Sequence, residues 1–335
     1  MINLKKKINS KLIFCAINSY GSLSNFYAIY NIALKNKKIF FFTSKKINKK
    51  KLLYKKNIKY YFFDNNISFK NCLNILKRHK VQNLYCGNNG NNHFEYTFLK
   101  CAKKNKIKTL SILDSDIWPL RRFGLNILNK IQYNFHDFIG VPNKKVYNLL
   151  KAKTNSKIFI CGVPSLEFNI FKYYKSKKII NSSTNILYIS TPFEKKTEIS
   201  INNNQDIFFD EKKIYKIFIK KLNEISIVKN IKFKIFFKPH PLEKFKSIDY
   251  YKKISRLCGP KIKFIITNEL ENYKLYRKIN ISIGISSTML YETSLCGIPT
   301  YSLQFSKDFN SNKKNFFKDK KGIKIINNVD NLDMI

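Results

Sequence analysis

The sequence predicts an α/β protein made of two Rossmann-like domains, each built on a doubly wound parallel sheet, that face a cleft. Apolar runs rich in β-branched residues alternate with segments of helical periodicity along the chain. The chain has 335 residues, more than one compact core usually holds, and 44% of them are hydrophobic. Small polar residues follow several apolar runs, as they do where a strand of a parallel sheet turns into a helix.

The first domain is predicted to span residues 1–165. Its first strand, over residues 11–18, leads into a serine-rich turn at 19–25 and a helix over 26–34. That turn lacks the GxGxxG pattern, which disfavours NAD binding. Further strands are expected at 38–43, 59–63, 82–86, 108–113, 137–141 and 157–161, with helices at 68–80, 94–105 and 144–152.

Residues 166–184, rich in lysine and small polar residues, are predicted to link the domains. The second domain is predicted over 185–335, and its last part, beyond Tyr301, is expected to be a polar peripheral cap with one weak strand. Its strands are expected at 185–190, 231–237, 261–267 and 281–285, with one more that ends at 303 and another at 323–326. Its helices are expected at 210–228, 250–257 and 271–278, and a last helix begins at 288. Asp210 and Glu211 are interpreted as the helix start only, because acidic residues there favour the helix dipole.

The formal net charge is +43, from 64 basic and 21 acidic residues. Only five of the basic residues are arginine, and Asn, Ile, Phe and Tyr are abundant, which favours AT-rich codon usage as the origin of much of the lysine. Such a surface still attracts anionic substrates and acidic lipid headgroups, so we expect peripheral contact with an anionic membrane. Nucleic acid is not an expected partner, because the aromatic residues fall largely inside apolar runs.

Seven cysteines in an odd count, without a CxxC pair, favour reduced thiols over a disulfide framework or a zinc site. No apolar segment approaches the roughly 18 residues that a membrane-spanning helix needs. The apolar core at residues 12–17 is also shorter than that of a signal peptide. The expected location is therefore the cytoplasm, with peripheral contact at the inner face of the membrane.

Two motifs in the second domain follow predicted strands. Lys238–Pro239–His240–Pro241 ends one of them, and the prolines restrict the backbone around the imidazole. The stretch GISSTMLYE, residues 284–292, reads as a strand end, a small polar loop and a helix start, so Ser286, Ser287 and Thr288 fall at a helix N-terminus that suits phosphate. A simple helix cap is the alternative for the serines. Glu292, one turn further on, is predicted to point at the same crevice, and Lys238 to add charge.

Together these motifs resemble the HP and Ser/Thr motifs of bacterial sialyltransferases and polysialyltransferases. They also resemble the wider group of GT-B-type transferases, which includes the teichoic-acid glycerophosphotransferases. The motifs occupy about residues 235–303, and the general layout of the resemblance covers both halves of the chain. It implies that His240, Ser286 and Ser287 hold the phosphate of a cytidine nucleotide.

Asp114 and Asp116 directly follow a predicted strand of the first domain. A carboxylate at such a place can accept the proton of an attacking hydroxyl. The sialyltransferases carry an acidic pair followed by glycine at a comparable point, whereas here Ser115 separates the acids and no glycine follows. Asp114 or Asp116 is therefore one candidate base, and helix capping or pairing with Arg121 and Arg122 is the alternative.

The leading hypothesis is a GT-B-like glycosyltransferase that uses no metal or cofactor. It would move a sugar from a nucleotide donor, CMP-linked if sialic-acid-like, onto a cell-surface glycan or lipid-linked acceptor bound on the first domain. His240, if protonated, would stabilise charge on the departing phosphate. His93 and Glu95 would line the acceptor site or belong to a capped turn. A glycerophosphotransferase, a sugar-nucleotide epimerase, and a non-catalytic glycan- or nucleic-acid-binding protein are the alternatives.

Overall fold

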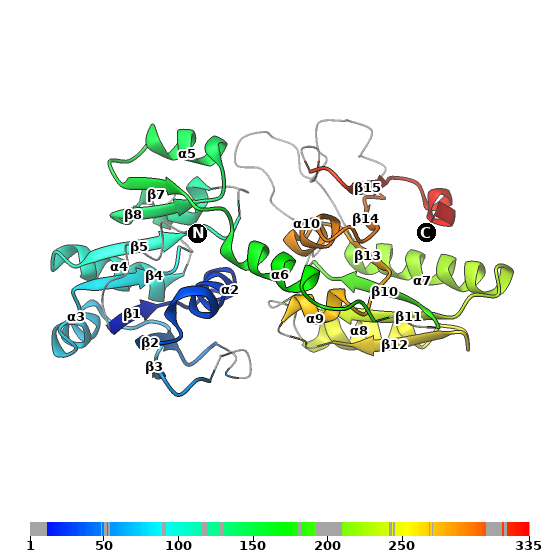
Figure 1. Ribbon diagram of the computed structural model, residues 1–335, viewed down its shortest axis with the longest axis horizontal. Coiled ribbons are helices and arrows are strands. Elements are labelled where there is room, and N and C mark those ends of the chain that lie inside the picture. The colour runs from blue at the N-terminus through cyan, green and yellow to red at the C-terminus, as the bar shows by residue number, and fades with distance from the viewer. Residues whose placement is uncertain are drawn as a thin grey trace. The chain divides into compact units, whose positions relative to one another are not determined.

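The computed structural model describes residues 12–47, 49, 52, 54–88, 92–115, 119–127, 130–179, 182–191, 210–240, 243, 245–267, 269, 271–305, 317 and 320–334. The chain divides into two compact units. Unit 1 comprises Met1–Phe168 and unit 2 comprises Asn169–Ile335. Figure 1 shows that each unit contains a sheet with helices packed against it.

Unit 1 is built on a parallel sheet whose described strands lie in the order β3-β2-β1-β4-β5-β8-β9. The strands are β1 (Leu12–Ala16), β2 (Lys38–Ser44), β3 (Ile58–Phe63), β4 (Asn83–Cys86), β5 (Lys108–Ile112), β8 (Phe138–Val141) and β9 (Lys157–Ile160). The chain runs outward from β1 to β3 and then returns to the other side of β1 with β4. The switch point of this sheet therefore lies between β1 and β4.

The helices of unit 1 bury their apolar side chains against this sheet. They are α2 (Tyr20–Ile29), continued by the π-helical turn η1 (Tyr30–Leu34), α3 (Phe69–Arg78), α4 (His93–Lys104) and α5 (Lys144–Lys151). Ring pairs such as Phe42 with Phe98, whose centroids are 5.5 Å apart, join the sheet to α4. A short 3-10 helix, η3 (Leu120–Phe123), precedes an antiparallel hairpin of β6 (Gly124–Ile127) and β7 (Lys130–Tyr133).

Unit 2 contains a second parallel sheet, with described strands in the order β12-β11-β10-β13-β14-β15. They are β10 (Thr184–Ile189), β11 (Phe233–Lys238), β12 (Ile262–Ile266), β13 (Ile281–Gly284), β14 (Thr300–Leu303) and β15 (Ile323–Ile326). The first crossovers go from β10 to β11 and β12, and the next one returns to β13 on the other side of β10. The switch point, where such sheets bind ligands at the strand ends, therefore lies between β10 and β13.

The helices that accompany this second sheet are α7 (Glu211–Val228), α8 (Phe245–Ser255), α9 (Asn272–Tyr276), α10 (Thr288–Leu295) and the 3-10 helix η5 (Val329–Met334). A cluster of aromatic rings joins α7 and α8 to the strands. Tyr188 lies 4.8 Å from Tyr215 and 5.8 Å from Phe237, and Phe237 lies 4.5 Å from Tyr251, measured between ring centroids. All four side chains are fully or almost fully buried, so this cluster fixes α7 and α8 on the sheet.

The predicted fold class is confirmed, since both units are α/β with parallel sheets. The strand expected at 323–326 is present as β15, and it pairs in parallel with β14. Two details differ from the sequence expectations. The segment predicted as a linker contains most of the helix α6 (Pro164–Tyr174). The hairpin of β6 and β7 was not anticipated, because its strands are only four residues long. Within the described parts, no helix has the length and apolar character needed to cross a membrane.

Candidate functional site

Three strands of unit 2 end at the same level of the sheet. Ile189, the last residue of β10, is paired with Lys238 of β11 on one side and with Gly284 of β13 on the other. The segments that follow these strands therefore leave the sheet side by side, with neighbouring strands about 4.8 Å apart. This register brings His240 and Ser286 to the two sides of the segment that follows β10.

Ser190, the first residue after β10, holds the loop that carries His240. Its side chain is fully buried. Its Oγ accepts a hydrogen bond of 2.8 Å from the backbone N–H of His240 and donates one of 3.0 Å to Oε2 of Glu243. The backbone N–H of Glu243 donates to the carbonyl of His240, which closes the loop. Ser190 thus fixes the backbone of a half-buried histidine at the strand end.

Thr191 holds the second loop. Its Oγ1 donates a hydrogen bond of 2.9 Å to the carbonyl of Ser286. Ser302, on β14, donates to the carbonyl of Ile285 from the other side, at 2.6 Å. Gly284 permits the close approach of β13 to β10, because a Cβ at this position would lie 2.7 Å from the carbonyl oxygen of Ile189. The loop before α10 is therefore fixed from both neighbouring strands.

The hydroxyls predicted at the start of α10 lie there, with different exposure. Ser287 is the N-cap residue, and its Oγ accepts a hydrogen bond of 3.3 Å from the N–H of Met289. The helix-cap interpretation is thus correct for Ser287, whose O–H remains a donor. Ser286 is half-buried and Thr288 is exposed. The first N–H groups of a helix lack partners within the helix, so they add donors at this edge.

Glu292 lies inside α10 with internal partners. Its side chain is almost completely buried, and its Oε2 accepts hydrogen bonds from the Tyr276 hydroxyl, from Nδ2 of Asn272 at 3.2 Å and from Nδ2 of Asn169 at 3.4 Å. Burial raises the pKa of Glu292, and these hydrogen bonds and the charge of Lys238 oppose the rise. The ammonium group of Lys238 donates to the carbonyl of Glu269. Both residues therefore fix neighbouring elements at this edge.

Glu211 belongs to this edge too, which the sequence interpretation missed. Asp210 is the N-cap of α7 as expected, and its Oδ1 accepts a hydrogen bond from the N–H of Lys213 at 3.1 Å. The side chain of Glu211, however, is almost fully buried, and its Oε1 accepts a hydrogen bond of 2.7 Å from the N–H of Thr191. Burial raises the pKa of Glu211 well above its usual value. The Thr191 hydrogen bond opposes this rise, and Glu243 adds to it.

We expect the raised pKa of Glu211 to make stability depend on pH. The folded state keeps a proton on Glu211 at pH values where the unfolded chain has lost it. Its contribution to the free energy of unfolding is therefore full below about pH 4 and falls as the pH rises toward the folded pKa. Glutamine cannot ionise. The free energy of unfolding of Glu211→Gln, relative to that of the wild type, should therefore rise by up to roughly 1.4 kcal/mol for each pH unit in that window.

Urea unfolding of both proteins, at pH values about one unit apart between pH 4 and pH 8, measures this difference in the free energy of unfolding. The matched control is Glu224→Gln, which changes an exposed acid of the same helix and should follow the wild type at every pH. A Glu211→Gln variant that also follows the wild type would show that this carboxyl group ionises alike in both states.

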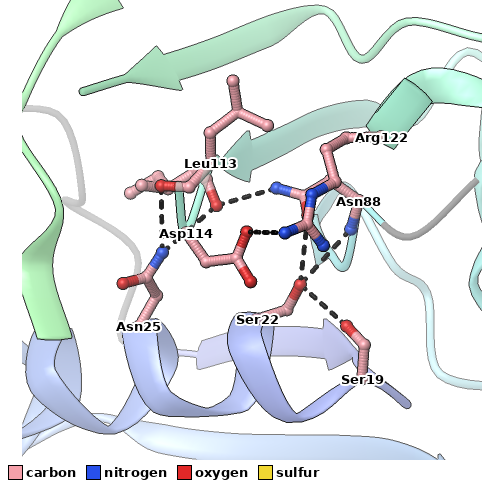
Figure 2. Close-up of polar contacts among 8 residues, drawn as sticks. Ser19, Ser22, Asn25, Asn88, Leu113, Asp114 and Arg122 are labelled. Carbon is pink, nitrogen blue, oxygen red and sulfur yellow. Dashed lines mark hydrogen bonds and ion pairs between the residues drawn. The ribbon is translucent and has the colours of Figure 1, made fainter. Parts of the chain in front are cut away.

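In unit 1, Asp114 lies just past the end of β5 and against the first turn of α2. Its Oδ1 forms an ion pair of 3.1 Å with Nη2 of Arg122, so the pairing alternative is correct for Arg122. A Cβ at Gly21 would fall 1.5 Å from Oδ2 of Asp114, so the carboxylate occupies the space beside that glycine. Figure 2 shows the carboxylate turned toward α2 and the guanidinium group. The Asp114 side chain keeps 14% exposure, which leaves it some access to solvent.

Buried amides fix α2 at this place. Nδ2 of Asn25 donates to the carbonyl of Leu113 at 3.2 Å, and Nδ2 of Asn88 donates to that of Ile112 at 2.8 Å (Figure 2). Ser22 donates to Oδ1 of Asn88 at 3.4 Å. Because Ser22, Asn25 and Asn88 are buried, they position α2, and the serine-rich turn at 19–25 lies almost entirely inside that helix.

Glu95 has a structural role as well. Asn92 caps α4 through a hydrogen bond of 3.3 Å that its Oδ1 accepts from the N–H of Glu95, so the capped-turn interpretation is correct. The buried carboxylate of Glu95 reaches the end of β1, where its Oε1 accepts a hydrogen bond of 2.6 Å from the N–H of Asn18. It thereby attaches the start of α4, the helix that follows β4, to the segment after β1.

Some predicted residues lie outside the described part of the chain. These are Asp116 and Pro241, together with the side chain of Arg121. The roles predicted for Asp116 and for the second proline of the His240 loop stay predictions. Among the residues that the structure describes, no group of three or more His, Cys, Asp or Glu side chains is arranged to hold a metal ion.

No protein-family model matches the chain, and no curated protein matches its sequence. Solved structures match its fold. UDP-GlcNAc 2-epimerase from Methanocaldococcus jannaschii is 13% identical with a TM-score of 0.60, over 96% of this chain and 90% of that one. Anabaena HepE, solved with UDP and glucose, is 11% identical with a TM-score of 0.54, over 97% and 89%. MurG from Acinetobacter baumannii is 10% identical with a TM-score of 0.50, over 96% and 88%. At these identities the likeness concerns the fold, which is of the GT-B type.

Proposed function

We propose that this chain is a GT-B-type glycosyltransferase that moves a sugar from a nucleotide donor onto a hydroxyl of a glycan or glycolipid. The donor's phosphate binds at the carboxyl edge of the unit 2 sheet, between the His240 loop and the start of α10. One observation carries the proposal. Ser190 and Thr191, at the end of the central strand, bond to the backbone of His240 and of Ser286, and so hold both loops at the switch point.

The groups at this edge suit a departing phosphate. The hydroxyls of Ser286, Ser287 and Thr288 and the first N–H groups of α10 are hydrogen-bond donors, and the helix dipole favours an anion there. A protonated His240 adds positive charge where charge develops in the transition state. Lys238 and Glu292 act by positioning, because they bond to the carbonyl of Glu269 and to the elements around α10.

We assign the acceptor side of the reaction to unit 1. Asp114 is the proposed base, since its half-buried carboxylate follows β5 at the carboxyl edge of the sheet and keeps some exposure. Arg122 pairs with Oδ1 and orients the carboxylate, so the oxygen proposed to take the proton of the acceptor hydroxyl is Oδ2, which lies beside Gly21. Asp116 is the alternative base.

Two observations bear on the nucleotide, and they favour different ones. The HP and Ser/Thr motifs favour CMP, because they resemble those of sialyltransferases. The structures similar in fold favour UDP, since they include UDP-GlcNAc 2-epimerases and HepE, which was solved with UDP and glucose. Both nucleotides present a phosphate to the same edge, so the phosphate site is common to the two assignments.

A thermal-shift panel of CMP-, UDP-, GDP- and CDP-linked ligands tests the proposal. We expect one of them to raise the melting temperature of the wild type, because a ligand that binds only the folded state stabilises it. His240→Ala should lose that shift, and the control His93→Ala, which changes a histidine of unit 1, should keep it. If no ligand stabilises the chain while nucleic acid binds with a steep salt dependence, the binding-protein alternative replaces the transferase.

A sugar-nucleotide epimerase is the second candidate, favoured by the likeness in fold to the M. jannaschii enzyme. The two reactions differ in what they need. An epimerase converts UDP-GlcNAc without an acceptor, and inversion by removal and return of a proton brings a solvent hydrogen to the inverted carbon, whereas a transferase moves the sugar to another molecule. Deuterium uptake from D₂O into the sugar nucleotide, without acceptor, would identify the epimerase. Stabilisation by a CDP-linked glycerol in the panel would favour the glycerophosphotransferase.

A further inference from the structure

The end of α7 exposes aliphatic side chains to solvent. Ile227 is 70% exposed and Val228 is 83% exposed, and they are the last two residues of the helix. Leu257, just past the end of α8, is 52% exposed. Aliphatic side chains at such exposure lose the stabilisation that burial would give them, so a group of them indicates a contact surface.

These three side chains belong to one surface of unit 2. Asn223 lies one turn before Ile227 on the same face of α7. Its Nδ2 donates a hydrogen bond of 2.7 Å to the carbonyl of Leu257, and its Oδ1 accepts one of 2.8 Å from the N–H of Gly259. The end of α8 therefore packs beside the end of α7. We call the surface formed by Ile227, Val228 and Leu257 the α7–α8 tip.

The tip lies at the edge of the sheet opposite the candidate site. In a parallel sheet, each crossover helix runs back from the carboxyl end of one strand to the amino end of the next. The last residues of α7 and α8 therefore lie where β11 and β12 begin, whereas α10 begins just past the end of β13 (Figure 1). His240 follows the end of β11. A contact made by the tip leaves the carboxyl edge of unit 2 accessible.

Cations surround the tip. Exposed basic residues follow or flank its aliphatic side chains, namely Lys229, Lys232, Lys253 and Arg256. Lys261, beside them, donates a hydrogen bond to Oδ1 of Asn230 at 2.6 Å. Among the described residues, acids of these elements are paired with lysines: Lys221 pairs with Glu224 and Asp333, at 3.5 Å and 3.3 Å, and Lys252 pairs with Asp249 at 3.2 Å. The charge around the aliphatic side chains is therefore positive.

We propose that the α7–α8 tip is a docking surface for an anionic lipid bilayer. Aliphatic side chains enter the boundary between headgroups and acyl chains, and the surrounding amines and guanidinium meet the lipid phosphates. A second copy of the chain fits less well, because it would bring like charge against like charge on a protein of net charge +43. Nucleic acid offers phosphates but no apolar layer for Ile227 and Val228.

Flotation of the full chain with vesicles tests this proposal. We expect the wild type to float with vesicles of phosphatidylglycerol and phosphatidylcholine, and not with phosphatidylcholine alone. The double variant Ile227→Glu/Val228→Glu should reduce the bound fraction roughly tenfold or more, since it places charge where apolar contact is needed. Ile160→Glu is the matched control, because Ile160 is an aliphatic residue of unit 1 that is 50% exposed. Melting curves of each variant confirm that it folds.

Three outcomes would overturn the proposal. The wild type fails to float with the anionic vesicles, or the double variant floats as well as the wild type does. In the third, light scattering shows a dimer that the double variant converts to a monomer, so that the tip is an interface between copies. None of these outcomes bears on nucleotide binding at the carboxyl edge, which the thermal-shift panel tests separately.

Discussion

Asp114→Asn is expected to lower the turnover of sugar transfer by roughly 10²- to 10⁴-fold, the range of general-base contributions. The amide cannot take the proton of the acceptor hydroxyl, although it is nearly isosteric with the carboxylate. Nucleotide affinity should stay unchanged, because the phosphate is assigned to unit 2 and Asp114 belongs to unit 1. Steady-state kinetics give the first quantity, and calorimetric titration with the nucleotide gives the second.

The control for this change is Asp64→Asn, which alters an exposed acid of the same unit that pairs with Lys45 at 3.0 Å. It should leave both quantities unaltered. Asp114 also packs beside Gly21 and pairs with Arg122, so melting curves of Asp114→Asn separate a role in folding from a role in proton transfer. A fall in melting temperature that accounts for the lost activity identifies the structural role. Full activity of a folded Asp114→Asn variant would move the base to Asp116.

Ser190→Ala is expected to lower both stability and nucleotide affinity. The change removes the hydroxyl that accepts from the N–H of His240 and donates to Glu243. A buried polar group left without its partner costs about 1–3 kcal/mol. Because the His240 loop loses its attachment to β10, we expect nucleotide affinity to fall roughly tenfold, which corresponds to about 1.4 kcal/mol. Urea unfolding and calorimetric titration measure the two effects.

Ser294→Ala is the matched control for Ser190→Ala. The Ser294 hydroxyl donates to the carbonyl of Tyr291 within α10, at 2.9 Å, and it bonds to no described residue of either loop. Its loss should change nucleotide affinity little. If Ser190→Ala binds the nucleotide as tightly as this control does, the attachment of the His240 loop to β10 is not what prepares the site.

Strand positions were predictable because buried strands of a parallel sheet carry continuous apolar runs. Ile323–Ile326 was recognised as a strand, yet its pairing with β14 was not, since a strand's sequence does not specify its partner. The hairpin of β6 and β7 was missed because four-residue strands carry too little periodicity. Helix α6 was not predicted, because the composition of its segment, with lysine and small polar residues, suggested a linker.

The two motif residues were predictable, whereas the residues that hold them were not. His240 and Ser286 stand out by their local sequence, and strand register then brings their loops to the same edge. Ser190 and Thr191 had only their place after a strand as a signal, which many serines and threonines share. Glu211 was assigned to the helix start, because the sequence alone did not reveal its contact with Thr191 across 20 residues.

The shared phosphate site is tested most directly by calorimetric titration of the wild type, His240→Ala, Ser286→Ala and the double variant. The ligand is the nucleotide that stabilises the chain most in the panel. If both side chains contact one phosphate, each single variant should bind the nucleotide more weakly than the wild type. The loss in the double variant should then differ from the sum of the two single losses by a coupling energy of about 0.5–3 kcal/mol. Two losses that simply add, or unchanged affinity in His240→Ala, would contradict a single site formed by the two loops.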